Sequence, residues 1–338
     1  MTVSALSAVY GGVARLRRSW YERRPASRAR LPRPVISVGN IVVGGSGKTP
    51  VVAALAAVLT RLGHRPAILS RGYGRTNRPG EVVIVSDGTS PLVPVEQSGD
   101  EPQMLARDLA GVPIVVCADR FRAGQAAIER FNPTTLILDD GFQHLQLART
   151  IDLLVISPAD LTEQLLPSGR LREPLSAART ADAVLVFGDA ENTHRVARAV
   201  GVSSSFVVTR SLHPLRLLSD TAGSSEGGHL TLLPPAGAPV AAVAGIAKPE
   251  RFFSSLRHSH HVVSELVFAD HHWFTDAEVR EVERQAREHG AVAVVTTAKD
   301  GVRLERHRAA MSLPWAILPI QVSIEPGAAF ESWLQQRL

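Results

Sequence analysis

The stretch "GNIVVGGSGKTPVV", residues 39–52, constrains the fold of this chain more than any other segment. It ends in Gly-Lys-Thr, as the phosphate-binding loop G-x-x-x-x-G-K-S/T does, although Val42 stands where that pattern has its first glycine. An apolar run precedes the loop and a helical pattern follows it, so backbone N–H groups and the helix dipole would point at an anion. The stretch predicts a nucleotide phosphate site, with a cradle of Gly44, Gly45, Ser46 and Gly47, Lys48 reaching the phosphates, and Thr49 as a Mg²⁺ ligand.

The basic residues favour a phosphate loop over the alternative, a plain turn between a strand and a helix. Of 37 basic residues only three are lysines, namely Lys48, Lys248 and Lys299. A phosphate loop needs the compact ammonium of lysine, which a guanidinium does not imitate. The formal net charge of +5 favours anionic partners, which include nucleic acid, acidic lipid and phosphorylated substrates. A single cysteine, Cys117, excludes a disulfide within the chain.

A second motif supports a nucleotide site. The segment "LILDDGFQHLQL" is an apolar strand that ends in Asp139 and Asp140, as the second phosphate-site strand of nucleotide-binding enzymes does. The pair could cap a turn, but adjacent carboxylates repel each other unless a cation offsets them. A carboxylate at this strand end can hold Mg²⁺ beside Thr49. The two motifs together predict an enzyme that uses a nucleoside triphosphate, without identifying the acceptor.

The order of apolar runs predicts an α/β chain. From residue 34 to about residue 209, β-like runs alternate with helical patterns at 48–62, 100–110, 120–131 and 191–200. Strands without strict alternation that are separated by helices indicate a parallel sheet covered on both faces. We expect a P-loop core at 31–211, a β-hairpin linker around "TAGSSEGG" at 212–235, and a smaller α/β domain at 236–338, in which "WAILPIQV" supplies one strand.

The first 30 residues have a different character. On a helical wheel the apolar residues Val3, Leu6, Val9, Tyr10, Val13, Leu16 and Trp20 share one broad face, and the arginines Arg15, Arg17, Arg18, Arg23, Arg24, Arg28 and Arg30 lie after or around it. This pattern is typical of a helix lying on anionic lipid. A helix packed on the core of the protein would show the same pattern. No apolar run approaches the roughly 18 residues of a membrane span.

The chain resembles the tetraacyldisaccharide 4′-kinases, the lipid A 4′-kinases of Gram-negative bacteria. Across residues 15–334 it carries "VGNIVVGGSGKTPVV", "LSRGYGR", "GDEPQMLA", "DRFRAG", "LDDGFQHLQL", "PSGRLREP" and "FADHHWF" in the order and spacing of that family. The family also lacks the first glycine of the loop, so Val42 is consistent with a phosphate loop of variant spacing. The resemblance implies two α/β domains joined by a short β linker, with the active site between them.

The same resemblance implies the function. The family uses ATP and Mg²⁺ to phosphorylate the 4′-hydroxyl of a tetraacylated glucosamine disaccharide 1-phosphate, in lipid A and lipopolysaccharide biosynthesis. It works as a peripheral protein on the cytoplasmic face of the inner membrane and docks by its N-terminal helix. We therefore expect the lipid disaccharide and an anionic membrane surface as partners, with no nucleic acid and no obligate protein partner.

Roles for individual residues follow from the family motifs. Asp100 would be the base for the sugar hydroxyl, and His271 would pair with it and raise its proton affinity; Asp100 could also cap the helix that follows. Arg172 would neutralise the transferring phosphate. The Mg²⁺ candidates besides Thr49 are Asp139, Asp140 and Glu173. The expected lining of the nucleotide and sugar cleft comprises Tyr73, Glu101, Arg120, Gln143 and His144.

Two features favour other functions, and two rival functions stay open. The histidines His258, His260, His261, His271 and His272 could bind a metal, although no cysteine accompanies them. The segment "TTAKD" resembles a GTPase turn, but the guanine-reading N/T-K-x-D motif is absent from the sequence. A regulatory P-loop NTPase would hydrolyse ATP without a lipid acceptor. A peripheral membrane protein could hold a nucleotide as a structural ligand.

Overall fold

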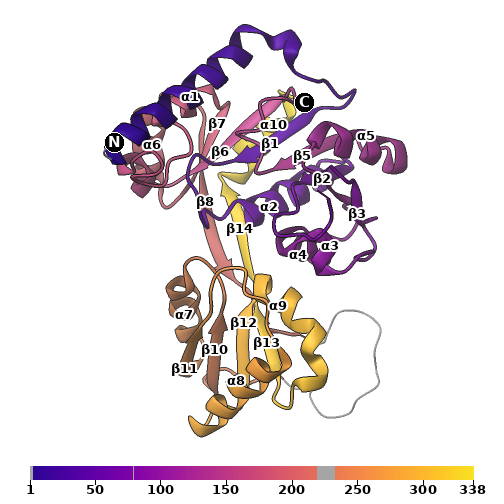
Figure 1. Ribbon diagram of the computed structural model, residues 1–338, viewed down its shortest axis with the longest axis vertical. Coiled ribbons are helices and arrows are strands. Elements are labelled where there is room, and N and C mark those ends of the chain that lie inside the picture. Colours follow the sequence, from indigo (N-terminus) through magenta and orange to yellow (C-terminus); the bar gives the residue numbers. More distant parts are fainter. Residues whose placement is uncertain (1–2, 79, 219–232) are drawn as a thin grey trace.

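The computed structural model describes residues 3–78, 80–218 and 233–338. Two sheets lie one beyond the other along the length of the molecule, and the long strands β8 and β14 run from one toward the other (Figure 1). In the described residues the larger sheet has nine strands and the smaller has five. This arrangement confirms the predicted fold class, a P-loop-like parallel sheet with a second α/β unit.

The larger sheet has the strand order β14-β8-β7-β6-β1-β5-β2-β4-β3. Within the described residues β3 and β14, at the two edges, pair antiparallel with their neighbours, and the other pairs are parallel. Its strands are β1 (Val35–Gly39), β2 (Pro66–Ser70), β3 (Val83–Ser86), β4 (Ile114–Val116), β5 (Thr135–Asp139), β6 (Ile151–Ile156), β7 (Ala183–Phe187), β8 (Ser205–Leu212) and β14 (Ile320–Glu325).

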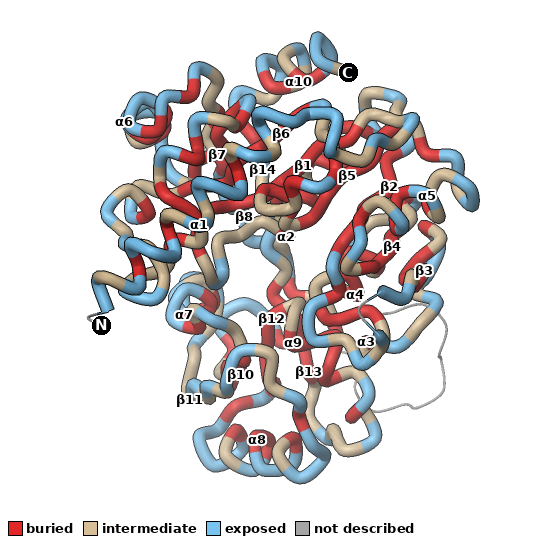
Figure 2. Tube along the Cα trace, turned by 45° about the horizontal axis from the view of Figure 1, so that its top comes forward, coloured by how far each residue is buried: buried red, intermediate tan, exposed pale blue. Residues whose placement is uncertain are grey.

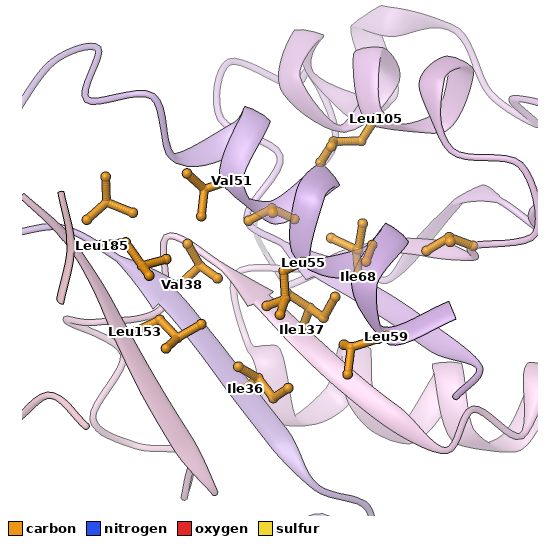
Figure 3. Packing of buried hydrophobic residues seen from close by; sticks show 14 of the residues in the cluster. Ile36, Val38, Val51, Leu55, Leu59, Ile68, Leu105, Ile137, Leu153 and Leu185 are labelled. Carbon is orange, nitrogen blue, oxygen red and sulfur yellow. The ribbon is translucent and has the colours of Figure 1, made fainter. Parts of the chain in front are cut away.

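Helices cover both faces of this sheet, as the sequence predicts. One face is covered by α2 (Lys48–Arg61), α4 (Asp100–Asp108) and α10 (Gly327–Gln335), and the other by α5 (Arg120–Phe131) and α6 (Ala190–Val200). In α2 the apolar residues Val51, Leu55 and Leu59 recur at intervals of four, so they share one face and pack over the strands (Figure 3). Each such fully buried side chain contributes about 1.5–3 kcal/mol to folding. This packing fixes α2, and with it the loop that α2 follows.

The smaller sheet has the order β11-β10-β12-β13-β9. Helix α7 (Pro249–Arg257) packs on one face, and α8 (Asp276–Glu288) and α9 (Ala298–Leu304) pack on the other. Its strands are β9 (Arg216–Leu217), β10 (Pro239–Ala244), β11 (His261–Val267), β12 (Ala293–Thr297) and β13 (Trp315–Leu318). The remaining helical elements are α3 (Val95–Ser98), η1 (Pro25–Ser27), η2 (Pro158–Thr162), η3 (Leu175–Thr180) and η4 (Glu305–Ala310).

The C-terminal residues depart from the expected domain division. We expected "WAILPIQV" to be one strand of the second domain, but Pro319 separates β13, in the smaller sheet, from β14, in the larger one. Proline cannot donate a ladder hydrogen bond, so the strand ends there. Helix α10 then buries Phe330 and Leu334 in the core of the larger sheet. Residues 219–232 of the expected hairpin linker lie outside the described residues, and the division at residue 235 stays a prediction.

Helix α1 (Val3–Arg23) lies along the larger unit (Figure 2), and most of its large apolar side chains are exposed. Leu16 is 73% exposed and Val13 is 60% exposed, whereas Ser7, Gly11 and Arg18 are the buried residues of the helix. A Cβ on Gly11 would stand 2.5 Å from Cδ1 of Leu165, so glycine permits this close approach. In the described part of the chain no helix has the length and apolarity that crossing a bilayer requires.

Candidate active site

The phosphate loop lies in a cleft between the two sheets, at the carboxyl end of β1. Gly44 and Gly47 have φ values of 93° and 81°, which a side chain would strain. Val42 is buried and bridges Leu171 of the "GRLREP" segment, while the N–H of Val43 donates to the carbonyl of Arg170 at 2.9 Å. Because this part of the loop is extended and paired, it needs no glycine at position 42.

Lys48 joins the loop to the end of the neighbouring strand β5. Its Nζ lies 3.3 Å from Oδ1 of Asp140 and donates to Oδ1 of Asn40 at 3.1 Å. Burial would raise the pKa of the Asp140 carboxyl, but Lys48 and Arg172 lower it. Asp140 has a φ of 54°, a left-handed conformation that non-glycine residues adopt at a cost and that is found at functional sites. The two predicted phosphate motifs therefore meet.

Asp139 offers an unused oxygen at the same place. The side chain is buried, its Oδ2 accepts from Oγ of Ser70 at 2.9 Å, and its Oδ1 has no hydrogen-bond partner among the described residues. Burial and the neighbouring Asp140 raise the pKa of Asp139. A buried carboxylate with a free oxygen beside a second carboxylate is stabilised by a cation. This geometry fits the predicted Mg²⁺ ligands Asp139, Asp140 and Thr49.

Arg172 and Glu173 are adjacent in sequence but make different contacts. Nη1 of Arg172 donates to Oδ2 of Asp140 at 3.0 Å and to Oε1 of Gln143 at 3.1 Å, which places Arg172 beside the phosphate loop, and its role toward the transferring phosphate stays a prediction. Glu173 is buried, and both of its carboxylate oxygens accept from Arg18 of α1. The expectation that Glu173 is a metal candidate is therefore wrong, because its oxygens are already paired with a guanidinium.

A second cluster joins the two units. Asp100, at the start of α4 in the larger unit, contacts the loop between β11 and α8 of the smaller unit. Nδ1 of His271 lies 2.9 Å from Oδ2 of Asp100, and His271 has a φ of 63°. Arg303 of α9 also donates to Asp100, and Nζ of Lys299 lies 3.8 Å away. The residue before α4 is Gly99, and no side chain caps that helix, so Asp100 pairs with cations rather than acting as a cap.

This arrangement corrects the expected effect of His271 on Asp100. Burial alone would raise the pKa of Asp100, but the hydrogen bond from His271 and the charges of Arg303 and Lys299 lower it below the usual range. The proton affinity of Asp100 is thus decreased and not increased. Arg303, which is fully buried although charged, was not among the residues predicted from the sequence. Its signal was available, since Arg303 stands one helical turn after Lys299 of "TTAKD".

The predicted lining residues divide into two groups. Tyr73 and Glu101 line the cleft, and the Tyr73 ring lies 5.4 Å from that of His271. Burial and the neighbouring carboxylate of Asp139 raise the pKa of Glu101 to about 7. Arg120, Gln143 and His144 are not among the cleft-lining residues. Arg120 is buried and donates to the carbonyls of Cys117 and Ala118. Gln143 donates to the carbonyl of Asn40 and accepts a hydrogen bond from Arg172.

The histidines of the second unit have partners of other kinds. His272 contacts Glu278 at 3.0 Å, and His258 contacts the carbonyl of Ser254 at 2.6 Å. Among the residues that the structure describes, no three His, Cys, Asp or Glu side chains are grouped so that they could hold a metal ion. Any cation at Asp139 and Asp140 would therefore need ligands of other kinds, such as the Thr49 hydroxyl and phosphate oxygens.

Comparison with known proteins gives one consistent result. The family model described as tetraacyldisaccharide-1-P 4′-kinase matches residues 1–338. A tetraacyldisaccharide 4′-kinase of Syntrophus aciditrophicus is 39% identical over 327 residues, which is 94% of this chain and 87% of the relative. That of Geobacter sulfurreducens is 40% identical over 328 residues, 94% of this chain and 86% of the relative. A crystal structure described as LpxK from Aquifex aeolicus in complex with ATP superposes with a TM-score of 0.77 at 29% identity, covering 99% of this chain and 98% of that one.

Proposed function

The chain belongs to the tetraacyldisaccharide-1-P 4′-kinase family, and we propose how its own residues carry out the reaction of that family. It transfers a phosphoryl group from ATP to the 4′-hydroxyl of a tetraacyldisaccharide 1-phosphate, a step of lipid A biosynthesis. The observation that carries this function is the position of Lys48 and Asp140 on one wall of a cleft whose other wall carries His271, which contacts Asp100. The donor site and His271 thus line one cavity, and the proposed base Asp100 is buried directly beside His271.

The donor site is built from the phosphate loop. Residues 44–49 supply backbone N–H groups and the ammonium of Lys48 to the β- and γ-phosphates, and Arg172 adds a charge beside Asp140. Thr49, Asp139 and Asp140 would hold Mg²⁺, since the free Oδ1 of Asp139 lacks any other partner among the described residues. When bound there, Mg²⁺ neutralises phosphate charge that develops during transfer. Glu173 has no part in this set.

The acceptor site lies around Asp100. Its lowered pKa keeps the carboxylate ionised, so it accepts the hydrogen bond of the 4′-hydroxyl and takes the proton as the phosphoryl group arrives. His271 and Arg303 hold the carboxylate in place, and Tyr73 and Glu101 lie on the wall where the sugar would pass. Arg120 and Gln143 act indirectly, since Arg120 donates to the carbonyl of Cys117 after β4 and Gln143 accepts from Arg172, whereas His144 lies outside the cleft lining.

The acyl chains of the acceptor place it in a bilayer, so the kinase must reach the membrane surface. We assign this contact to α1, whose outward apolar residues include Leu16 and Val13, with Arg15 and Arg23 beside them. Such a face would lie in the interface of an anionic membrane. For this substrate the membrane is the inner one, at its cytoplasmic face. Arg18, which the helical wheel also assigned to the lipid side, is buried against Glu173.

A reconstituted reaction tests the proposal. Purified protein is mixed with ATP, Mg²⁺ and tetraacyldisaccharide 1-phosphate, and the lipid product is analysed by mass spectrometry for one added phosphate. Lys48→Ala should remove nearly all transfer, because it deletes a charge that acts on the phosphates. Asp140→Asn should be similarly severe, with residual activity that depends on Mg²⁺ concentration. ATP hydrolysis at the same rate with and without the lipid would instead indicate a regulatory NTPase.

A further inference from the structure

All three lysines of the chain line the same cleft. Two of them have partners there, since Lys48 pairs with Asp140 and Lys299 with Asp270, at 3.3 Å and 2.9 Å. Lys248 forms no ion pair or side-chain hydrogen bond with any residue that the structure describes. Lysine is a compact point charge suited to phosphate oxygens, and this chain otherwise uses arginine for its basic surface. The position of Lys248 therefore needs a separate explanation.

The backbone brings Lys248 opposite the phosphate loop. It follows β10 and directly precedes α7, and the Cβ of its neighbour Ala247 lies 3.8 Å from the place where a Cβ on Gly45 would stand. Gly45 is in the middle of the phosphate loop, so this segment of the second unit covers the loop from the other side of the cleft. Lys248 thus belongs to the segment of the second unit that faces the phosphate cradle.

Two arginines add to the positive charge at this place. Arg251 follows on α7, and Arg210 of β8 has its Nη2 3.4 Å from the Cβ position of Gly47, with its guanidinium 3.7 Å from the centre of the Phe187 ring. Neither arginine forms an ion pair with a described residue. Burial, then Arg251 and Arg170, lower the pKa of Lys248. Positive charges that lack counter-ions in a cleft repel one another. An anion that enters the cleft removes this repulsion and lowers the free energy of the protein.

We propose that Lys248, with Arg251 and Arg210, binds phosphate oxygens of the ATP held in the phosphate loop, which makes the second unit part of the nucleotide site. This inference rests on the proposed function, which places ATP in that loop. The lipid acceptor carries a phosphate too, at position 1 of the disaccharide. The nucleotide is the better match, because the charged neighbours of Lys248 are Arg251, Arg170, Asp160 and Glu163, and none belongs to the base cluster of Asp100.

The test uses the full-length variants Lys248→Ala and Lys248→Arg. Arg280→Ala is the matched control, because it removes a positive charge from the exposed surface of α8 in the same unit. Equilibrium binding of ATP is measured by calorimetry without any lipid, and thermal melting verifies that each variant is folded. Loss of one charge-assisted phosphate contact should weaken ATP binding about ten- to a hundredfold in Lys248→Ala. Lys248→Arg should recover only part of it, and Arg280→Ala should bind as the wild type does.

Steady-state kinetics distinguish the two phosphate sources. The KM for ATP should rise in Lys248→Ala while the KM for the tetraacyldisaccharide 1-phosphate stays within about twofold of the wild-type value. Unchanged ATP binding with a raised lipid KM would overturn the proposal in favour of the acceptor phosphate. If Lys248→Ala keeps the wild-type ATP affinity and both wild-type KM values, the cluster binds neither the phosphates of ATP nor the phosphate of the lipid. The proposed function is tested apart from this, by wild-type phosphate transfer to the lipid.

Discussion

Arg18 of α1 and Glu173 of the "GRLREP" segment form a buried ion pair at two points, with Nε to Oε2 at 2.5 Å and Nη2 to Oε1 at 2.9 Å. The same guanidinium donates to the carbonyl of Phe142 and lies 4.4 Å from the centre of its ring. Phe142 follows Asp140 by two residues, and Arg172 precedes Glu173. Arg18 therefore links α1, the helix proposed to contact lipid, to the two segments that carry Asp140 and Arg172 of the phosphate site.

The ion pair predicts a large loss of stability when one partner is removed. Arg18→Met leaves the Glu173 carboxylate buried without a counter-charge, which should lower the free energy of unfolding by roughly 3–5 kcal/mol. The double variant Arg18→Met, Glu173→Leu should recover much of that loss, because it leaves no buried charge. Urea unfolding measures both. Arg15→Met, on the exposed side of α1, is the control, and equal stability of the Arg18 and Arg15 variants would rule out a structural ion pair.

Local sequence patterns predicted the parts of this fold that depend on local interactions. The helix predicted at 120–131 is present with the same bounds, because its apolar period and the cap by Asp119 are both encoded within one segment. The phosphate loop, Lys48 and the strand end at Asp140 were found for the same reason, and the structure brings them together. In each case neighbours in sequence determine the geometry.

The errors come from contacts between distant segments. Glu173 was taken as a metal candidate, although its partner Arg18 lies 155 residues earlier in the chain. Arg303 was missed because its contact with Asp100 joins α9 to α4 across 203 residues. The strand after Pro319 joined the larger sheet by pairing with β8, which no local pattern specifies. A sequence pattern can show that a residue is charged, but only the fold determines its partner.

Asp100 and His271 should behave as one unit in kinetics. Asp100→Ala and His271→Ala should each lower kcat about 10²- to 10⁴-fold, the usual contribution of a positioned base. The double variant should lose much less than the product of the two, since each single change already disables the pair. His258→Ala, at an exposed histidine of the same unit, should have little effect. Fully multiplicative losses in kcat would show that the two groups act independently.

His144 predicts a specific pH dependence of stability. Burial, aided by Arg120 and Arg149, lowers the pKa of His144 to about 4, from 6.5 in the unfolded chain. Between these two values the unfolded chain binds more protons than the folded one, so the stability contributed by neutral His144 falls as the pH drops from about 6.5 to about 4. At pH 7 the group is mostly neutral in both states, so its effect on stability there is small.

A variant that cannot titrate isolates this contribution. His144→Gln should lose less stability than the wild type over that pH range, by about 1–3 kcal/mol at the acid end. Denaturant unfolding at several pH values gives the difference between the two proteins, which cancels the titration of the other acidic groups. His194→Gln, at an exposed histidine of α6, should follow the wild-type curve. Parallel curves for His144→Gln and the wild type would contradict a folded state in which the half-buried His144 is neutral.

A test of lipid contact by the outward face of α1 must leave the helix in place. Ser7 donates to the carbonyl of Leu165, and Arg18 holds Glu173, so a truncated protein would lose folding contacts along with any lipid contact. Single changes on the outer face separate the two effects. Leu16→Asp and Val13→Asp remove apolar area at side chains that are 73% and 60% exposed, and they add a negative charge near anionic lipid.

We expect each of these variants to keep its melting temperature and ATP affinity while binding anionic vesicles at least about tenfold more weakly, because a buried leucine or valine contributes about 1.5–3 kcal/mol. Co-sedimentation with anionic and with neutral vesicles measures this. Wild-type binding should also weaken as salt rises, since the arginines of α1 attract the surface through screened charge. Val292→Asp, at a valine that is 47% exposed on the second unit, should bind vesicles as the wild type does. If Leu16→Asp binds equally well, α1 does not contact the membrane, and its exposed apolar residues must be covered in another way.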